Sequence, residues 1–155
     1  QALFDQDPHA FQLWAVSLIP DAQPWKGGKK GADSGIDGQV YFRTEKSESH
    51  RGIISVKGGK NVGVAMIRDL GHVIEREKAA IGFFITLTPP TSVMETEAVK
   101  AGYFETDRGR FRRLQIHTVE SLLAAARPEM PFVDSSAFKR AKREQSKSSQ
   151  GEMDL

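Results

Sequence analysis

Two residues of the chain, an aspartate and a lysine, could take part in the same reaction. Asp37 lies just after the glycine-rich stretch GADSG, and Lys57 ends the apolar segment GIISVK. A lysine directly after a buried strand is costly unless it has a partner or a function. A carboxylate can hold Mg²⁺, and an ammonium group can position water and offset the negative charge that develops on a phosphate. The spacing alone predicts either such a site or a plain Asp–Lys salt bridge.

Both residues fall on segments with strand patterns. Residues 36–44 alternate between apolar side chains on one face and polar side chains on the other, and residues 52–57 form an apolar run bounded by glycines. These patterns are typical of strands, and the polar connection between them predicts a hairpin. Paired in this way, the strands would bring Asp37 and Lys57 to the same edge of a sheet.

Predicted helices would cover this sheet. Asp7 and Pro8 predict the start of a helix, because a carboxylate can cap the first turn and proline fits its first position. The apolar face of this helix would consist of Phe11, Trp14, Ala15 and Leu18. Asn61 is predicted to cap a second helix that runs to about residue 78, and Thr91 and Thr118 are predicted to cap two more.

The remaining strands complete a recognisable class of fold. The apolar run 80–87 predicts a central strand buried on both faces, and residues 112–118 predict a further strand. We therefore predict a single α/β domain in which a central mixed sheet is flanked by helices. The domain is expected to span residues 1–133. Residues 134–155 are polar and basic, and we expect them to form a flexible tail.

Composition narrows the classes of protein that remain. The 155 residues include no cysteine, which excludes disulfides and thiolate metal sites, and no apolar run approaches the ~18 residues of a membrane span. Acidic and basic residues balance over residues 1–138, so any case for nucleic-acid binding depends on local clusters. Because the chain begins with Gln1, we expect a piece of a longer polypeptide.

The segments GADSGIDG, IISVKGGKN and FFITL follow one another on the predicted strands. Together they resemble the Mrr-like restriction endonucleases, a branch of the PD-(D/E)XK nuclease fold. The longer stretches GGKKGADSGIDG, MIRDLGHVIEREKAAIGFFITL and PPTSVMETEAVKAGYF resemble a nuclease-type domain attached to bacterial adenine-type DNA methyltransferases. The resemblance covers about residues 7–131. It implies an α-β-β-α-β core, in agreement with the order that the patterns predict.

The family pattern places an acidic residue at the head of one strand and a (D/E/Q)-x-K triplet on the next. Asp37 matches the acidic position, and Ser55, Val56 and Lys57 match the triplet, with a neutral hydroxyl in its first place. The resemblance implies that Asp37 and the Val56 carbonyl hold Mg²⁺, which Mn²⁺ could replace. Lys57 would act on water and phosphate. Gln12 stands where Mrr-like members commonly have a glutamate, and with Ser55 it would orient water or a ligand.

Basic residues near this site are candidates for contacts with the DNA backbone. Lys29 and Lys30 lie in the glycine-rich loop, Lys60 precedes a predicted helix, and Arg68 lies on that helix. Such residues neutralise phosphates without reading sequence, although a single charged residue is more often simply solvated. Asp33 is a further candidate ligand, but a capping role in its glycine turn is the more ordinary expectation.

The resemblance implies a cytoplasmic, bacterial, Mg²⁺-dependent endonuclease domain of a restriction–modification system. Its partner would be double-stranded DNA, with a homodimer and an attached methyltransferase domain as further expected partners and no membrane contact. Since Ser55 and Gln12 are neutral, the alternative is a catalytically degenerate DNA-binding or recognition module of a methyltransferase polypeptide. A protein-interaction domain is the third hypothesis, and absence of DNA binding at low salt would favour it.

Overall fold

The computed structural model describes residues 5–25, 35–43, 48–107 and 109–131. Its central sheet has the strand order β1-β2-β3-β4-β7. The strands are β1 (Gln23–Pro24), β2 (Gly38–Arg43), β3 (Ser49–Lys57), β4 (Ile81–Thr86) and β7 (Leu114–Thr118). β2 is antiparallel to β1 and β3, whereas β4 is parallel to β3 and β7. The predicted mixed sheet is therefore confirmed. The predicted tail at 134–155 lies outside the described residues.

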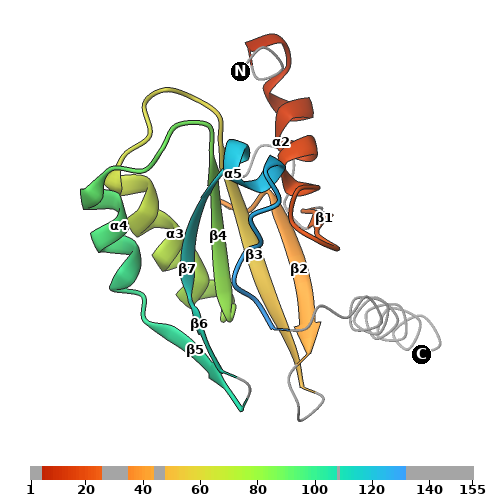
Figure 1. Ribbon diagram of the computed structural model, residues 1–155, viewed down its shortest axis with the longest axis vertical. Helices are drawn as coiled ribbons and strands as arrows, with labels where there is room; N and C mark the ends of the chain where they lie inside the picture. The colour runs from red at the N-terminus through yellow and green to blue at the C-terminus, as the bar shows by residue number, and fades with distance from the viewer. Residues whose placement is uncertain (1–4, 26–34, 44–47, 108, 132–155) are drawn as a thin grey trace, which may run out of the picture.

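Helices cover both faces of the sheet (Figure 1). Helices α3 (Val64–Glu77) and α4 (Ser92–Val99) pack on one face, and α2 (Pro8–Val16) and α5 (Val119–Leu123) pack on the other. Three predicted caps are confirmed: Asp7, Thr91 and Thr118 each accept a hydrogen bond from a first-turn amide. Among the described residues, no helix is both long and apolar enough to cross a membrane.

Two details of the predicted helices are wrong. Helix α3 begins after Gly63, not Asn61, because residues 61–63 stay irregular and the amphipathic stripe starts only at Val64. Trp14 is 38% exposed instead of buried, since α2 turns Phe11, Ala15 and Val16 toward the core.

Short strands outside the predicted set form at the margins of the fold. β1 pairs with the start of β2 and lies within residues 20–35, where the content of proline, glycine and lysine is typical of a loop. β5 (Tyr103–Thr106) and β6 (Gly109–Arg112) form a separate antiparallel hairpin. These strands are two to four residues long and largely exposed, so they carry too little hydrophobic periodicity to be predicted.

The core consists of two clusters, one on each face of the sheet. Phe83 and Ile85 of β4 pack toward α2 and α5, and Phe84 packs toward α3 and α4. All six residues of β4 are buried, as predicted for a strand covered on both faces. Successive side chains of β4 thus contact different pairs of helices. The same alternation holds for β3, where Ile53 and Ile54 belong to opposite clusters.

Gly38 allows α2 to lie close to the sheet. A Cβ atom at Gly38 would lie 2.6 Å from Val16 Cγ1 and 3.1 Å from the carbonyl oxygen of Gln23. Valine in a helix has one strongly preferred rotamer and cannot easily turn away. We therefore expect Gly38→Ala to lower the free energy of unfolding by about 1–3 kcal/mol, measured by urea denaturation.

The matched control is Gly71→Ala on α3. A Cβ atom there has no neighbour within 4 Å. Replacing a helical glycine with alanine should leave stability unchanged or raise it by about 0.5–1 kcal/mol. Equal stability of the Gly38→Ala variant and the parent chain would show that α2 adjusts without cost.

Candidate active site

Asp37 stands at the entrance to β2, directly beside β3. Its amide donates a hydrogen bond to the carbonyl of Ile54 (2.8 Å), and its Oδ2 accepts one from the amide of Val56 (2.7 Å). The antiparallel register, with Gly38 opposite Ile54, continues this arrangement along the two strands. The structure thus joins Asp37, the predicted acidic residue, to Val56, the middle residue of the predicted triplet, by a hydrogen bond from the main chain.

Ser55 and Lys57 lie on the face of β3 that α3 covers. They line a hollow of about 300 Å³ between β3 and α3, which we call the α3 hollow. Its other polar lining comes from Asp69, His72 and Arg76 of α3, with Gly35 at its margin. Ser55 is only 4% exposed, so its hydroxyl group faces this hollow from a buried position.

Gln12 and Lys57 line a second hollow at the carboxyl end of β3. This α2 hollow measures about 280 Å³ and includes Val56, the glycine turn after Lys57, and Lys60 at its exposed margin. Lys57 therefore borders both hollows. The four predicted catalytic residues come from α2, from the start of β2 and from β3, and they surround the end of one strand.

The Lys57 ammonium group makes no ion pair within 4.0 Å with any residue of the described ranges. The Asp–Lys salt bridge that the sequence also allowed is therefore not formed. Asp37 instead uses its carboxylate to accept the Val56 amide. A half-buried lysine without an ion pair among the described residues borders two hollows, which is the arrangement expected of a group that meets an anionic ligand.

The donor atoms at this strand end are those of a sparse metal site. The described residues contain no group of three or more His, Cys, Asp or Glu side chains that could hold a metal ion. Asp37 is the carboxylate at this point, beside the main chain of Val56. Mg²⁺ commonly binds through one or two carboxylates and keeps water and substrate phosphates as its remaining ligands. The residues present fit an ion of that kind.

The family model Mrr_cat, described as restriction endonuclease, matches residues 5–114. The chain belongs to this restriction endonuclease family. Among solved structures, its fold is similar to that of the MspJI restriction endonuclease in complex with a 27-mer oligonucleotide, with a TM-score of 0.50 and 15% sequence identity. The similarity covers 79% of this chain and 28% of the MspJI chain. No curated protein matches the chain.

Membership of the restriction endonuclease family confirms the resemblance seen in the segments around Asp37 and Lys57. The MspJI similarity confirms the predicted α/β fold, and because the chain spans well under half of MspJI, it is comparable to one part of that protein. The attachment to a methyltransferase stays a prediction.

The predicted DNA-binding residues of this restriction endonuclease domain separate into different positions. Lys60 lies at the margin of the α2 hollow. Arg68 pairs with Glu97 of α4 at 3.4 Å. A hydrogen bond from Lys100, assisted by the charge of Arg68, lowers the pKa of Glu97. Arg68 thus joins α3 to α4, and its role in DNA binding stays a prediction. Lys29, Lys30 and Asp33 lie outside the described residues.

The arginines near residue 110 occupy the other end of the sheet. Arg110 stacks over Tyr103 at 4.1 Å from the ring centroid, and Arg113 pairs with Glu75 at 3.1 Å. They precede β7, whereas Lys57 ends β3, and both strands run parallel to β4. Figure 1 shows the β5–β6 hairpin at the end of the sheet away from the β3–α3 connection. These arginines are therefore not part of the candidate site.

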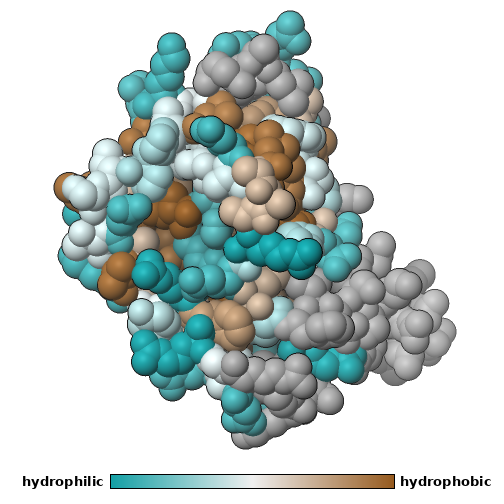
Figure 2. All heavy atoms as spheres, viewed as in Figure 1, coloured by the Kyte–Doolittle hydropathy of each residue, from teal (hydrophilic) through white to brown (hydrophobic). Residues whose placement is uncertain are grey.

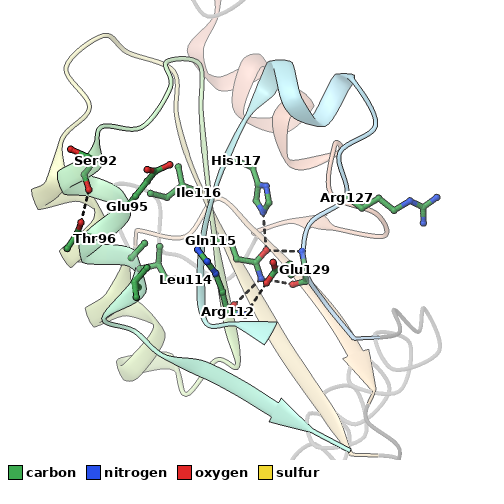
Figure 3. A pocket seen from close by; sticks show the side chains of 12 residues that line it. Ser92, Glu95, Thr96, Arg112, Leu114, Gln115, Ile116, His117, Arg127 and Glu129 are labelled. Atoms are coloured by element: carbon green, nitrogen blue, oxygen red, sulfur yellow. Dashed lines mark hydrogen bonds between the residues drawn. The ribbon is translucent and has the colours of Figure 1, made fainter. Parts of the chain in front are cut away.

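A hollow of about 610 Å³ extends from α4 across β7 to the segment around Glu129 (Figure 3). The side chain of Gln115 points toward Glu129, on the side of β7 away from α4, donating to the carbonyls of Arg112 and Glu129 and accepting from the amide of Glu129 (Figure 3). The Nε2 atom of His117 forms a hydrogen bond of 3.0 Å with the side-chain oxygen of Gln115. Burial lowers the pKa of His117. Because these groups satisfy one another, we assign this hollow the structural role of fastening the segment around Glu129 to the sheet.

Around that hollow, hydrophilic and hydrophobic side chains are interspersed on the surface (Figure 2). Ser92, Glu95 and Thr96 of α4 face Leu114 and Ile116 of β7 across it (Figure 3). This hollow is larger than the α3 hollow and the α2 hollow, but the family motif lies at the carboxyl end of β3.

Sequence reasoning did not select the three polar residues of α3 that line the α3 hollow. Asp69, His72 and Arg76 follow an i, i+3, i+7 spacing and form one stripe beside the buried stripe of Ile67, Leu70, Val73 and Ile74. The spacing was available as a signal, because positions three or four apart share one side of a helix. Which side faces the strand end depends on how α3 packs on the sheet.

Proposed function

We propose that this restriction endonuclease domain hydrolyses phosphodiester bonds in double-stranded DNA with the help of Mg²⁺, for which Mn²⁺ can substitute. The observation that supports the proposal is the hydrogen bond from the Val56 amide to the Asp37 carboxylate at the end of β3, where Lys57 follows in the strand and borders both hollows. The MspJI structure, which contains an oligonucleotide, supports DNA as the substrate class.

Each residue has a role that its chemistry allows. The Asp37 carboxylate and the Val56 carbonyl would hold Mg²⁺, which when bound polarises a phosphoryl oxygen as a Lewis acid. Lys57 orients the attacking water and stabilises the charge that grows on the phosphate as the bond to the leaving oxygen breaks. Gln12, across the α2 hollow, and Ser55, beside Lys57, orient water through hydrogen bonds.

The proposal extends to the setting of the domain. A restriction–modification polypeptide with an attached methyltransferase domain would supply protection of the host DNA, and a homodimer would supply a second site for cutting the second strand. Both belong to the proposal through the resemblance of the sequence segments, and neither is needed for cleavage of a single strand.

Asp37→Asn tests the proposal on supercoiled plasmid with Mg²⁺ or Mn²⁺. Asparagine keeps an oxygen that can accept the Val56 amide, so the local fold should survive while the negative charge is lost. We expect nicking and linearisation to slow by about 10²–10³-fold, the range typical of losing one group that stabilises charge. Chelation by EDTA should stop cutting by the parent chain.

Unchanged cutting by Asp37→Asn would remove Asp37 from the mechanism. Asp107→Asn is the matched control, because this exposed aspartate lies in the β5–β6 hairpin, at the other end of the sheet. Its cutting rate should equal that of the parent.

A second candidate function is a DNA-binding module that does not cut. The observation that favours it is the pair of neutral side chains, Gln12 and Ser55, where the family pattern commonly has acidic residues. This candidate predicts duplex binding that weakens with salt, together with plasmid that stays supercoiled at every Mg²⁺ and Mn²⁺ concentration.

A further inference from the structure

We propose that the α3 hollow binds a second phosphate of the DNA strand, next to the phosphate that is cut, through Ser55, His72 and Arg76. This inference rests on the proposed function because it takes DNA as the ligand. It names the surface along which the strand would run: from the α2 hollow, past Lys57, and onto the stripe of α3.

The charges around the α3 hollow favour an anion. Lys57 and Arg76 each contribute a positive charge to its lining, whereas Asp69 contributes one negative charge. Arg76 also approaches Glu77 at 3.6 Å and makes a further interaction, and its guanidinium group shares five N–H donors among these partners and a phosphate. His72 offers at least one ring N–H in either charge state. The lining as a whole is therefore basic and rich in donors.

The hydroxyl group of Ser55 points to a polar ligand. Ser55 is 96% buried, since 4% of its surface is exposed, and it lines the hollow. None of the described residues gives its side chain a hydrogen-bond partner. The Ser55 oxygen itself stays accessible from the hollow, so a phosphate oxygen there would accept its proton. In this view the Ser55 hydroxyl donates its proton to the phosphate and accepts from the water that it orients, whereas an ionised carboxylate at the same position could only accept.

The positions of the donors fit an extended strand. His72 and Arg76 are four residues apart on α3, so they lie about 6 Å apart along the helix axis. Lys57 borders both hollows, which makes them neighbours. A strand whose cut phosphate lies beside Lys57 in the α2 hollow would therefore bring a neighbouring phosphate to the α3 hollow.

The test measures binding of the full chain to a DNA duplex in EDTA, by fluorescence anisotropy at several KCl concentrations. One lost phosphate contact should reduce the slope of log K against log salt by about 0.9. We expect this reduction for the double variant His72→Ala with Arg76→Ala, together with weaker binding to every duplex sequence tried. Asp69→Asn should bind more tightly than the parent, because it removes a negative charge from the hollow.

Arg110→Ala is the matched control, since Arg110 lies on the hairpin at the other end of the sheet. Its salt slope should equal that of the parent. His72, Arg76 and Asp69 are exposed helical positions, so the variants should fold, and circular dichroism checks this.

A double variant with the parent's slope would overturn the inference, as would weaker DNA binding by Asp69→Asn. Loss of Mn²⁺ binding in Asp69→Asn, measured by calorimetry, with an unchanged slope in the double variant would assign the hollow to a cation instead. Because binding in EDTA does not require cutting, a reduced slope supports the phosphate site even if no cleavage is ever observed.

Discussion

Lys57→Ala is expected to slow DNA cleavage by about 10²–10³-fold while leaving the fold intact. Lys57 borders both hollows, so its ammonium group is placed to meet a phosphate from either side. No described residue forms an ion pair with Lys57, so the substitution breaks no ion pair among the described residues. The activity should therefore fall without a matching fall in the melting temperature. Plasmid cleavage rates and thermal unfolding measure the two effects.

Lys60→Ala is the matched control for Lys57→Ala. Lys60 is exposed at the margin of the α2 hollow, where it can contact the DNA backbone but lies outside the α3 hollow. Its loss should weaken DNA binding modestly and leave the maximal cleavage rate nearly unchanged. If Lys57→Ala cuts at the parent's rate, Lys57 has no part in the reaction, and the family motif persists here for reasons of fold alone.

Phe84→Ala is expected to lower the free energy of unfolding by about 3–5 kcal/mol, the largest stability effect that we predict. Phe84 is fully buried in β4, within the cluster that includes Leu70, Ile74 and Met94. Replacing it with alanine leaves a cavity at the centre of the contact between the sheet and α3. Urea denaturation would measure the loss.

The same substitution should affect the candidate site. Phe84 stands beside Ser55 in the parallel pairing of β3 and β4, and it shares a core cluster with Leu70 and Val73, which line the α3 hollow. Cleavage should therefore decline even at temperatures where the variant stays folded. Val93→Ala is the control, since Val93 is 59% exposed on α4, and its stability should stay within about 0.5 kcal/mol of the parent. A Phe84→Ala variant as stable as this control would contradict the packing described here.

The order of the main elements could be read from the sequence because each carries a local physical signal. The apolar run of β4 is long enough to require burial on both faces, and Asp7, Thr91 and Thr118 each cap the helix that follows them. The β5–β6 hairpin and β1 carried no such signal, since short exposed strands have little periodicity and are fixed by their partners.

The identities of Asp37, Ser55, Val56, Lys57 and Gln12 as candidates came from the sequence, since the motif is local. Their meeting around one strand end came from tertiary structure, because α2, β2 and β3 converge only when the sheet pairs and α2 packs over it. The same holds for Asp69, His72 and Arg76: their spacing marks one stripe of a helix, but only the packing of α3 turns that stripe toward Lys57. Arg68 of the same helix lies outside that stripe and forms an ion pair with Glu97 of α4. A sequence fixes which side chains share a face, whereas the burial of the opposite face decides what that face meets.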